Sequence, residues 1–130
     1  MTLDDDVRGF VQGPNFGTLT TLFADGQPQT QVMWVDADDD HLLINTEVHR
    51  AKYRNALRDP RVTVTVWASG NPYRYVEVRG RVVDVVLGDE ARHHIDACSQ
   101  VYLGKPYPNK VTSERAILKV APDRVLRQGV

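Results

Sequence analysis

The stretch Leu42-Leu-Ile-Asn-Thr-Glu-Val-His-Arg-Ala-Lys-Tyr-Arg-Asn-Ala-Leu-Arg-Asp-Pro-Arg-Val62 decides how this sequence is interpreted. It predicts an apolar strand, a polar turn over residues 45–49 and a short basic helix. The helix is expected to stop at Asp59-Pro60, because the residue before a proline avoids the helical conformation. A new strand then begins at Val62.

The predicted helix carries cations where a helix start favours anions. Arg50, Lys52 and Arg54 fall in the first turn, and His49 precedes it. A helix start has partial positive charge, so these cations cost stability unless an anion neutralises them. Free amides, the Thr46 hydroxyl and the cations together are typical of a phosphate site. The alternative is a solvated surface helix, since Arg and Lys are good helix formers.

Length and composition point to one ordinary globular domain over residues 1–130. The net charge of -1 gives no reason to expect nucleic acid or an acidic membrane as a partner. The single Cys98 excludes an internal disulfide, and no apolar run approaches the ~20 residues that span a bilayer. The acidic N-terminus does not resemble a signal peptide. We therefore expect a cytoplasmic protein.

Alternating and β-branched segments predict six or so antiparallel strands. These cover residues 16–23, 29–35, 41–46, 62–67, 75–87 and 116–120, with Pro122 closing the last. Asp25-Gly26 marks a hairpin, residues 68–74 are expected to form a loop, and Gly80 indicates a bulge or bend. Such strands predict a mainly β fold in which a small barrel removes exposed edges.

Two further helices are expected to flank this barrel. Residues 3–12 have helical apolar spacing, with Thr2 and Asp5 placed as a capping box. Residues 88–103 carry an apolar stripe in which Cys98 is expected to be a small buried hydrophobe.

The basic helix has an apolar face of its own. Tyr53, Ala56 and Leu57 share one side at helical spacing and are expected to dock on the sheet. This arrangement directs Arg50 and Lys52 toward the mouth of the preceding turn.

No self-sufficient catalytic or metal-binding set stands out in the sequence. His93 and His94 are adjacent, so they cannot form an i, i+4 metal pair on a helix. Glu47 and Glu77 stand alone and are expected to be solvated. The acidic turn 36–40 lacks the Gly and distal Glu of an EF-hand, which favours a solvated hairpin tip. We assign no catalytic residue and no metal ligand, and expect any redox chemistry to belong to a bound cofactor.

The segment from Asn45 to Val62 resembles the signature of the pyridoxamine 5'-phosphate oxidase-like split β-barrel superfamily, through Arg-x-Lys-x-x-Asn followed by Asp-Pro-Arg-Val. More narrowly it resembles the F420-dependent flavin/deazaflavin oxidoreductases. Further matches are the strand at 17–21, the Asp25-Gly26-x-Pro28 hairpin, the strand at 76–82 and the stretch 117–125. The resemblance spans nearly the whole chain and implies an FMN-binding-like split β-barrel.

The resemblance also implies an obligate homodimer with two cofactors in grooves between the barrels. Carried over to this sequence, Arg50 and Lys52 hold the cofactor phosphate, while Asn45, Thr46 and the turn backbone assist.

The remaining site residues implied by the resemblance lie outside the turn. The second strand, at Gln31, Val32 and Met33, lies along the isoalloxazine-like ring and offers backbone hydrogen bonds. The loop around Tyr73 reaches the site from the partner subunit.

The implied reaction is hydride transfer from reduced coenzyme F420 to a conjugated acceptor such as an enone, a quinone or a tetrapyrrole. FMN is the runner-up cofactor, because both cofactors carry a phosphate near the ring. The longer glutamate tail of F420 would follow a path lined by Arg54, Arg58, Lys105 and Lys110 if these cations converge.

Two other classes of protein stay open. A non-catalytic binder would store or sense a flavin, a deazaflavin or a haem without turnover. An oligonucleotide-binding barrel would show a basic face with interleaved aromatics, but the aromatics are scattered and the charge is balanced. We therefore expect a second copy of the chain and a small-molecule acceptor as partners, and neither nucleic acid nor a membrane.

Overall fold

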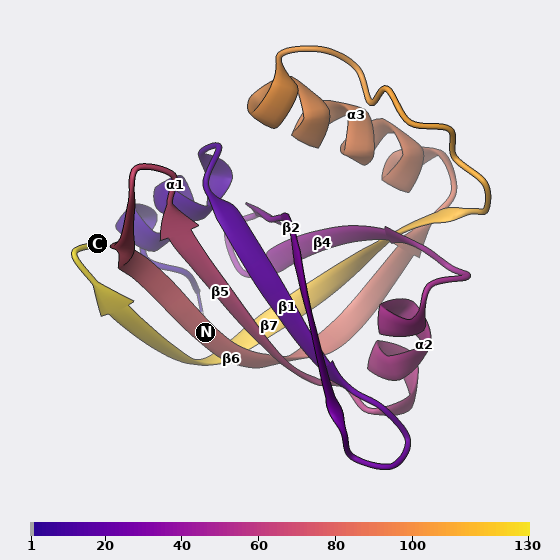
Figure 1. Ribbon diagram of the computed structural model, residues 1–130, viewed down its shortest axis with the longest axis horizontal. Helices are drawn as coiled ribbons and strands as arrows, with labels where there is room; N and C mark the ends of the chain where they lie inside the picture. Colours follow the sequence, from indigo (N-terminus) through magenta and orange to yellow (C-terminus); the bar gives the residue numbers. More distant parts are fainter. Residues whose placement is uncertain (1) are drawn as a thin grey trace.

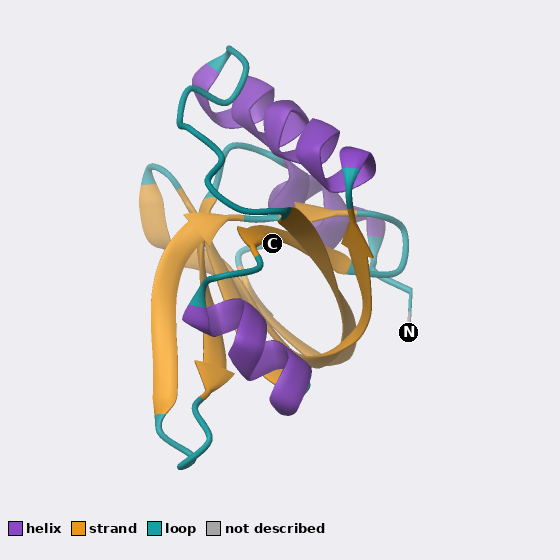
Figure 2. Cartoon of the chain, turned by 90° about the vertical axis from the view of Figure 1, so that its right-hand side faces the viewer, coloured by secondary structure: helices purple, strands orange, loops and turns teal. Residues whose placement is uncertain are grey.

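The computed structural model describes residues 2–130 as one curled antiparallel sheet with three helices. The elements are α1 (Asp5–Gln12), β1 (Phe16–Leu22), β2 (Pro28–Trp34), β3 (Asp36–Ala37), β4 (Leu42–Glu47), α2 (Ala51–Arg58), β5 (Arg61–Ala68), β6 (Asn71–Leu87), α3 (Asp89–Leu103) and β7 (Arg115–Gln128). The strand order is β2-β1-β5-β6-β7-β4-β3. The sheet curls into an open barrel (Figure 2), which confirms the predicted mainly β split-barrel fold with flanking helices.

The long strand β6 bends so that the sheet can close on itself. It pairs with β5 on one side and with β7 on the other, and its register with β7 shifts between Arg79 and Gly80. A Cβ atom at Gly80 would collide with the carbonyl oxygen of Ala121. Glycine is therefore required here by the close approach of two backbones, and the predicted bend is confirmed.

We expect Gly80→Ala to lower the free energy of unfolding by about 1–3 kcal/mol, because the added methyl group must push two paired strands apart. Gly70→Ala is the matched control, since nothing lies within 4 Å of a Cβ atom at Gly70. Urea denaturation of both variants measures the difference. Equal stability of the two variants would contradict the close approach.

Helices α1 and α2 lie at opposite ends of the curved sheet (Figure 1), and the barrel encloses the core between them. The expectation that Leu57 docks on the sheet is wrong, because its side chain is 54% exposed. The buried face of α2 instead consists of Lys52, Asn55 and Ala56. Asn55 donates a hydrogen bond to Thr21 Oγ1 at 3.1 Å, so a polar contact anchors this two-turn helix.

Two predicted boundaries differ from the structure. The expected loop 68–74 is a tight hairpin, since β5 ends at Ala68 and β6 begins at Asn71. The last strand does not stop at Pro122 but runs on to Gln128. Pro122 faces Gly80 at the register shift, where the ladder is already disrupted and a missing N–H group costs little.

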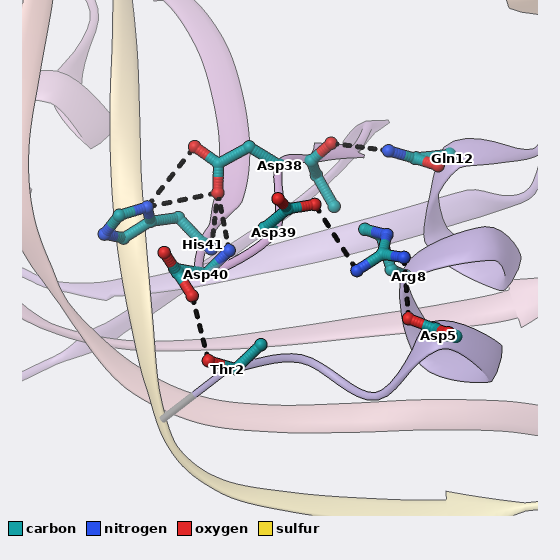
Figure 3. Close-up of polar contacts among 9 residues, drawn as sticks. Thr2, Asp5, Arg8, Gln12, Asp38, Asp39, Asp40 and His41 are labelled. Atoms are coloured by element: carbon teal, nitrogen blue, oxygen red, sulfur yellow. Dashed lines mark hydrogen bonds and ion pairs between the residues drawn. The ribbon is translucent and has the colours of Figure 1, made fainter.

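The acidic turn between β3 and β4 is tied to the N-terminal segment (Figure 3). The predicted capping box is wrong: Asp4 precedes α1 without a side-chain cap, and Thr2 Oγ1 donates to Asp40 Oδ1 at 3.0 Å. Arg8 lies 3.5 Å from Asp39. The carboxylates of this turn therefore contact α1 and the chain before it.

Candidate functional site

A cavity of about 380 Å³ lies between the end of β2, the β4–α2 turn, α3 and the loop that follows α3. Its polar lining includes Asn45, Arg50, Lys52 and Arg115, which lie close together and form what we call the cationic end. Its apolar lining includes Val32, Met33, Trp34, Ile95, Leu103, Tyr107 and Pro108, which we call the apolar end. The two sets adjoin where the Arg115 guanidinium lies over the Tyr107 ring.

Five of the eight residues predicted to bind a cofactor line this cavity: Val32, Met33, Asn45, Arg50 and Lys52.

Gln31, Thr46 and Tyr73 do not line it. Thr46 is 1% exposed, and its hydroxyl has no hydrogen-bond partner among residues 2–130. Tyr73 is 75% exposed in the β5–β6 hairpin, so the fold of one chain does not bring it to the cavity.

The cationic end begins at the start of α2. Arg50 occupies the N-cap position, and no side chain caps the helix. Lys52 is only 8% exposed. Burial, reinforced by the charges of Arg50 and Arg115, lowers the pKa of Lys52 to about 8. The positive charges of Arg50 and Arg115 therefore repel that of Lys52 in the ligand-free protein. Repulsion of this kind is expected of a site that binds an anion.

Arg115 is a cavity residue that the sequence analysis missed. Its Nε donates to Asn45 Oδ1 at 2.7 Å, and its guanidinium lies 5.3 Å from the centroid of the Tyr107 ring. Its Nη1 is buried and has no hydrogen-bond partner in the described part of the chain. Its nearest anion, Glu47 Oε2, lies 3.7 Å away, which is too far for a hydrogen bond. A buried donor without a hydrogen bond costs about 1–3 kcal/mol, so this group favours an acceptor oxygen in the cavity.

No local pattern marks Arg115 in the sequence. It lies next to Arg50 only because β7 pairs with β4, with Arg115 opposite Glu47. Burial lowers the pKa of Arg115, partly offset by Tyr107 and Glu47, and the charge of Arg50 lowers it further.

The expectation that Glu47 is solvated is wrong, because its side chain is 2% exposed. Its Oε1 accepts hydrogen bonds from the N–H groups of Thr112 at 2.7 Å and Ser113 at 2.8 Å. Its Oε2 lies 3.5 Å from Arg50 and 3.7 Å from Arg115. Burial raises the pKa of Glu47, but these N–H groups and charges outweigh it, so its pKa is lowered and the carboxylate is ionised.

The apolar end of the cavity is held by a cluster of aromatic rings. Trp34 stacks on Tyr102 with centroids 5.1 Å apart, and Tyr107 meets Trp34 edge-on at 6.0 Å. The Tyr102 hydroxyl donates to the carbonyl of Asn15 at 2.6 Å and receives the N–H of Val35 at 3.2 Å. The ring of Trp34 is thereby fixed and presents apolar surface suited to a planar ligand.

Three potential metal ligands, Asp36, His94 and Cys98, come together beside the cavity, which Cys98 itself lines. His94 Nε2 lies 2.9 Å from Asp36 Oδ2 and 3.5 Å from Cys98 Sγ. The prediction that the sequence holds no set of His, Cys and carboxylate at metal-ligand spacing missed the i, i+4 spacing of His94 and Cys98, to which the fold adds Asp36. Burial, reinforced by the charge of Asp36, raises the pKa of Cys98 to about 12, so its thiol stays protonated.

Hydrogen bonds around His94 oppose metal binding there. Asn45 Nδ2 donates to His94 Nδ1 at 3.0 Å and to the carbonyl of Ala91 at 2.9 Å, while Arg115 fixes the amide oxygen. This pattern assigns the His94 proton to Nε2, which donates to Asp36. A metal on Nε2 would leave an Nδ1–H group facing another N–H donor. The hydrogen bonds between Asp36 and His94 and between His94 and Asn45 instead orient the Asn45 amide, which in turn positions Arg115.

None of the four cations expected along the path of a cofactor tail lines the cavity: Arg54, Arg58, Lys105 and Lys110. Arg54 donates to the carbonyl of His49, and Arg58 donates to the carbonyl of Leu22 at 3.0 Å. These two arginines stabilise the ends of α2.

The described helices include none with both the length and the apolar character needed to cross a membrane.

Comparison with known proteins places this fold and this cavity in context. The profile of the family described as pyridoxamine 5'-phosphate oxidase matches residues 3–129. The chain is similar to the solved structure of an F420 reductase, with 31% identity and a TM-score of 0.82, covering 97% of this chain and 100% of that one.

Two more distant structures share the fold. One is a conserved hypothetical protein of Mycobacterium tuberculosis, with 24% identity, a TM-score of 0.74 and coverage of 96% of this chain and 83% of that one. The other is General Stress Protein 26 of Bacillus anthracis, with 20% identity, a TM-score of 0.68 and coverage of 95% and 97%. The resemblance carried by residues 45–62 is thus confirmed, and the chain belongs to the pyridoxamine 5'-phosphate oxidase family.

Proposed function

We propose that this protein is an oxidoreductase that transfers a hydride from reduced F420 to a conjugated small molecule such as an enone, a quinone or a tetrapyrrole. The observation that carries the proposal is the cavity itself, which is lined both by the cations Arg50, Lys52 and Arg115 and by the aromatic ring of Trp34. A ligand with a phosphate group and a flat ring matches both ends. The similarity to an F420 reductase supports the choice of cofactor.

The residues present fit such a cofactor. Arg50, Lys52 and Arg115 would bind its phosphate through charge-assisted hydrogen bonds, and Arg115 Nη1 would gain the acceptor that it lacks. Asn45 would act by holding Arg115 in place, whereas the Thr46 hydroxyl, buried away from the cavity lining, makes no contact with the cofactor in this arrangement. The bound cofactor supplies the hydride chemistry, while the protein orients the two planar reactants and excludes water.

Strand β2 offers a further contact for the ring. It lies at the edge of the sheet, where its outer backbone groups have no neighbouring strand. Successive residues of an edge strand direct their backbone groups alternately toward the neighbouring strand and away from it. The outward-pointing N–H and C=O groups between Gln31 and Met33 would therefore bind the polar edge of the ring.

We also propose that the protein is a homodimer. Val32, on the edge strand, is 65% exposed, and Tyr73 is 75% exposed. A second copy packed against β2 would cover Val32 and allow Tyr73 to complete the partner's site. Sedimentation equilibrium is expected to give twice the mass of one chain; a monomer at concentrations where the cofactor binds would reject this part of the proposal.

FMN is the second candidate cofactor. The specific observation in its favour is that the four cations expected to hold a glutamate tail lie outside the cavity. FMN has the phosphate and the ring but not the tail, so the same residues would serve it.

Side-by-side titration of the protein with F420 and with FMN, followed by fluorescence quenching, tests the proposal. We expect F420 to bind more tightly, and reduced F420 to be oxidised when a quinone or an enone is added. Preference for FMN would move the protein to the flavin branch, and binding without turnover with any acceptor would favour a carrier. Failure of both cofactors to bind would contradict the proposed function.

A further inference from the structure

The cationic end of the cavity carries a negative charge of its own. The buried carboxylate of Glu47 faces Arg50 and Arg115, the same two guanidinium groups that border the cavity. A ligand phosphate placed among Arg50, Lys52 and Arg115 would meet a site in which one of the three positive charges is already offset.

The two oxygens of Glu47 perform separable tasks. Oε1 accepts the hydrogen bonds from the backbone of Thr112 and Ser113, which anchors the loop before β7. Oε2 lies 3.5 Å from Arg50 and 3.7 Å from Arg115, beyond ordinary hydrogen-bond distance. Its effect on the arginines is therefore exerted through charge, and removing that charge need not displace the loop.

We propose that Glu47 is an internal counter-anion that competes with the phosphate of the ligand for Arg50 and Arg115, and so lowers the affinity of the cavity for anions. This inference rests on the proposed function, because it concerns the same phosphate site. In the free protein the Glu47 carboxylate compensates the buried charge of Arg115, which is 5% exposed. Glu47 therefore stabilises the free protein at the expense of anion affinity, and it limits how tightly the site holds a cofactor.

The substitution Glu47→Gln separates the two tasks. The amide oxygen of glutamine still accepts the two backbone hydrogen bonds, whereas the negative charge is lost. Glu114→Gln is the matched control, since Glu114 is exposed and the change in total charge is the same. Inorganic phosphate at constant ionic strength is the probe, so the comparison requires neither F420 nor FMN.

We expect Glu47→Gln to lower the melting temperature of the ligand-free protein, because Arg115 loses its compensating charge. We also expect it to raise the affinity for inorganic phosphate by about tenfold or more, measured by calorimetry, because a competing charge at this range is removed from a weakly screened site. Glu114→Gln is expected to change neither quantity.

Weaker or unchanged phosphate binding by Glu47→Gln would overturn the inference, since a residue that only anchors the loop would give that result. An equal gain in Glu114→Gln would also overturn it, because net charge alone would then explain the effect. If Glu47→Gln does not fold, the comparison is made in an Arg115→Gln background, where Arg115 is no longer an unpaired charge. There Glu47→Gln must still tighten phosphate binding, through Arg50 and Lys52.

The outcome is distinguishable from failure of the proposed function. A wild-type protein that binds neither F420 nor FMN rejects the proposed function, yet the phosphate affinities still test the role of Glu47. Tight F420 binding combined with no gain in Glu47→Gln retains the proposed function and rejects the counter-anion.

Discussion

Replacing Arg50 by Ala and Lys52 by Met in the same chain is expected to weaken cofactor binding by about 10²- to 10⁴-fold. Each charge-assisted hydrogen bond to a phosphate contributes about 1.5–3 kcal/mol, and both are lost. Methionine is chosen at position 52 because the Lys52 side chain is 8% exposed and a smaller residue would open a hole. Titration of the double variant with F420 and with FMN measures the loss.

The matched control for this variant is Arg124→Ala with Arg79→Met. Both residues are exposed and neither lines the cavity, so the control removes the same two charges from elsewhere on the chain. We expect it to bind the cofactor as the wild type does. Unchanged affinity in the Arg50 and Lys52 double variant, or an equal loss in the control, would show that the phosphate does not bind here.

Raising the pH above about 8 is expected to stabilise the ligand-free protein and to weaken its binding of the cofactor phosphate. The pKa of Lys52 is about 8 in the folded protein, against its ordinary value of 10.5. Between these values the unfolded chain holds a proton that the folded chain has released, so stability rises with pH across that window. At neutral pH the charged Lys52 costs on the order of 3 kcal/mol.

Binding of an anion reverses this preference, because a phosphate beside Lys52 favours the charged amine. The complex is therefore expected to take up a proton above about pH 8, and little at lower pH. Calorimetric titrations in buffers of different ionisation enthalpy measure this uptake. Lys52→Met is the control and should lose both the uptake and the rise in stability; proton uptake that persists in this variant would assign it to another group.

The barrel was predictable because its signals are local. Alternating valines around Val64 and Val78, the Asp25-Gly26 hairpin and the bend at Gly80 each specify backbone geometry within a few residues. The extension of β7 past Pro122 was not predictable, because a proline fits there only as a result of the bulge in its pairing with β6.

The cationic turn was predictable for the same reason, since Arg50 and Lys52 oppose the dipole of their own helix. Arg115 was not, because it joins them only when β7 pairs with β4, a contact between segments more than sixty residues apart. Glu47 looked like an isolated surface acid until that pairing buried it between two arginines. Local sequence signals thus predicted Arg50 and Lys52 of the proposed anion site, whereas Arg115 and Glu47 join it only through long-range strand pairing.

The central claim is that the cationic end of the cavity binds the phosphate of a planar cofactor. Its most direct test compares the affinity of the wild-type protein for the deazaflavin ribityl phosphate, without the glutamate tail, with that for the same chromophore without the phosphate. We expect removal of the phosphate to weaken binding by about a hundredfold or more, since at least two charge-assisted contacts disappear. Equal affinities would contradict the account, because Arg50, Lys52 and Arg115 would then make no contact with the ligand.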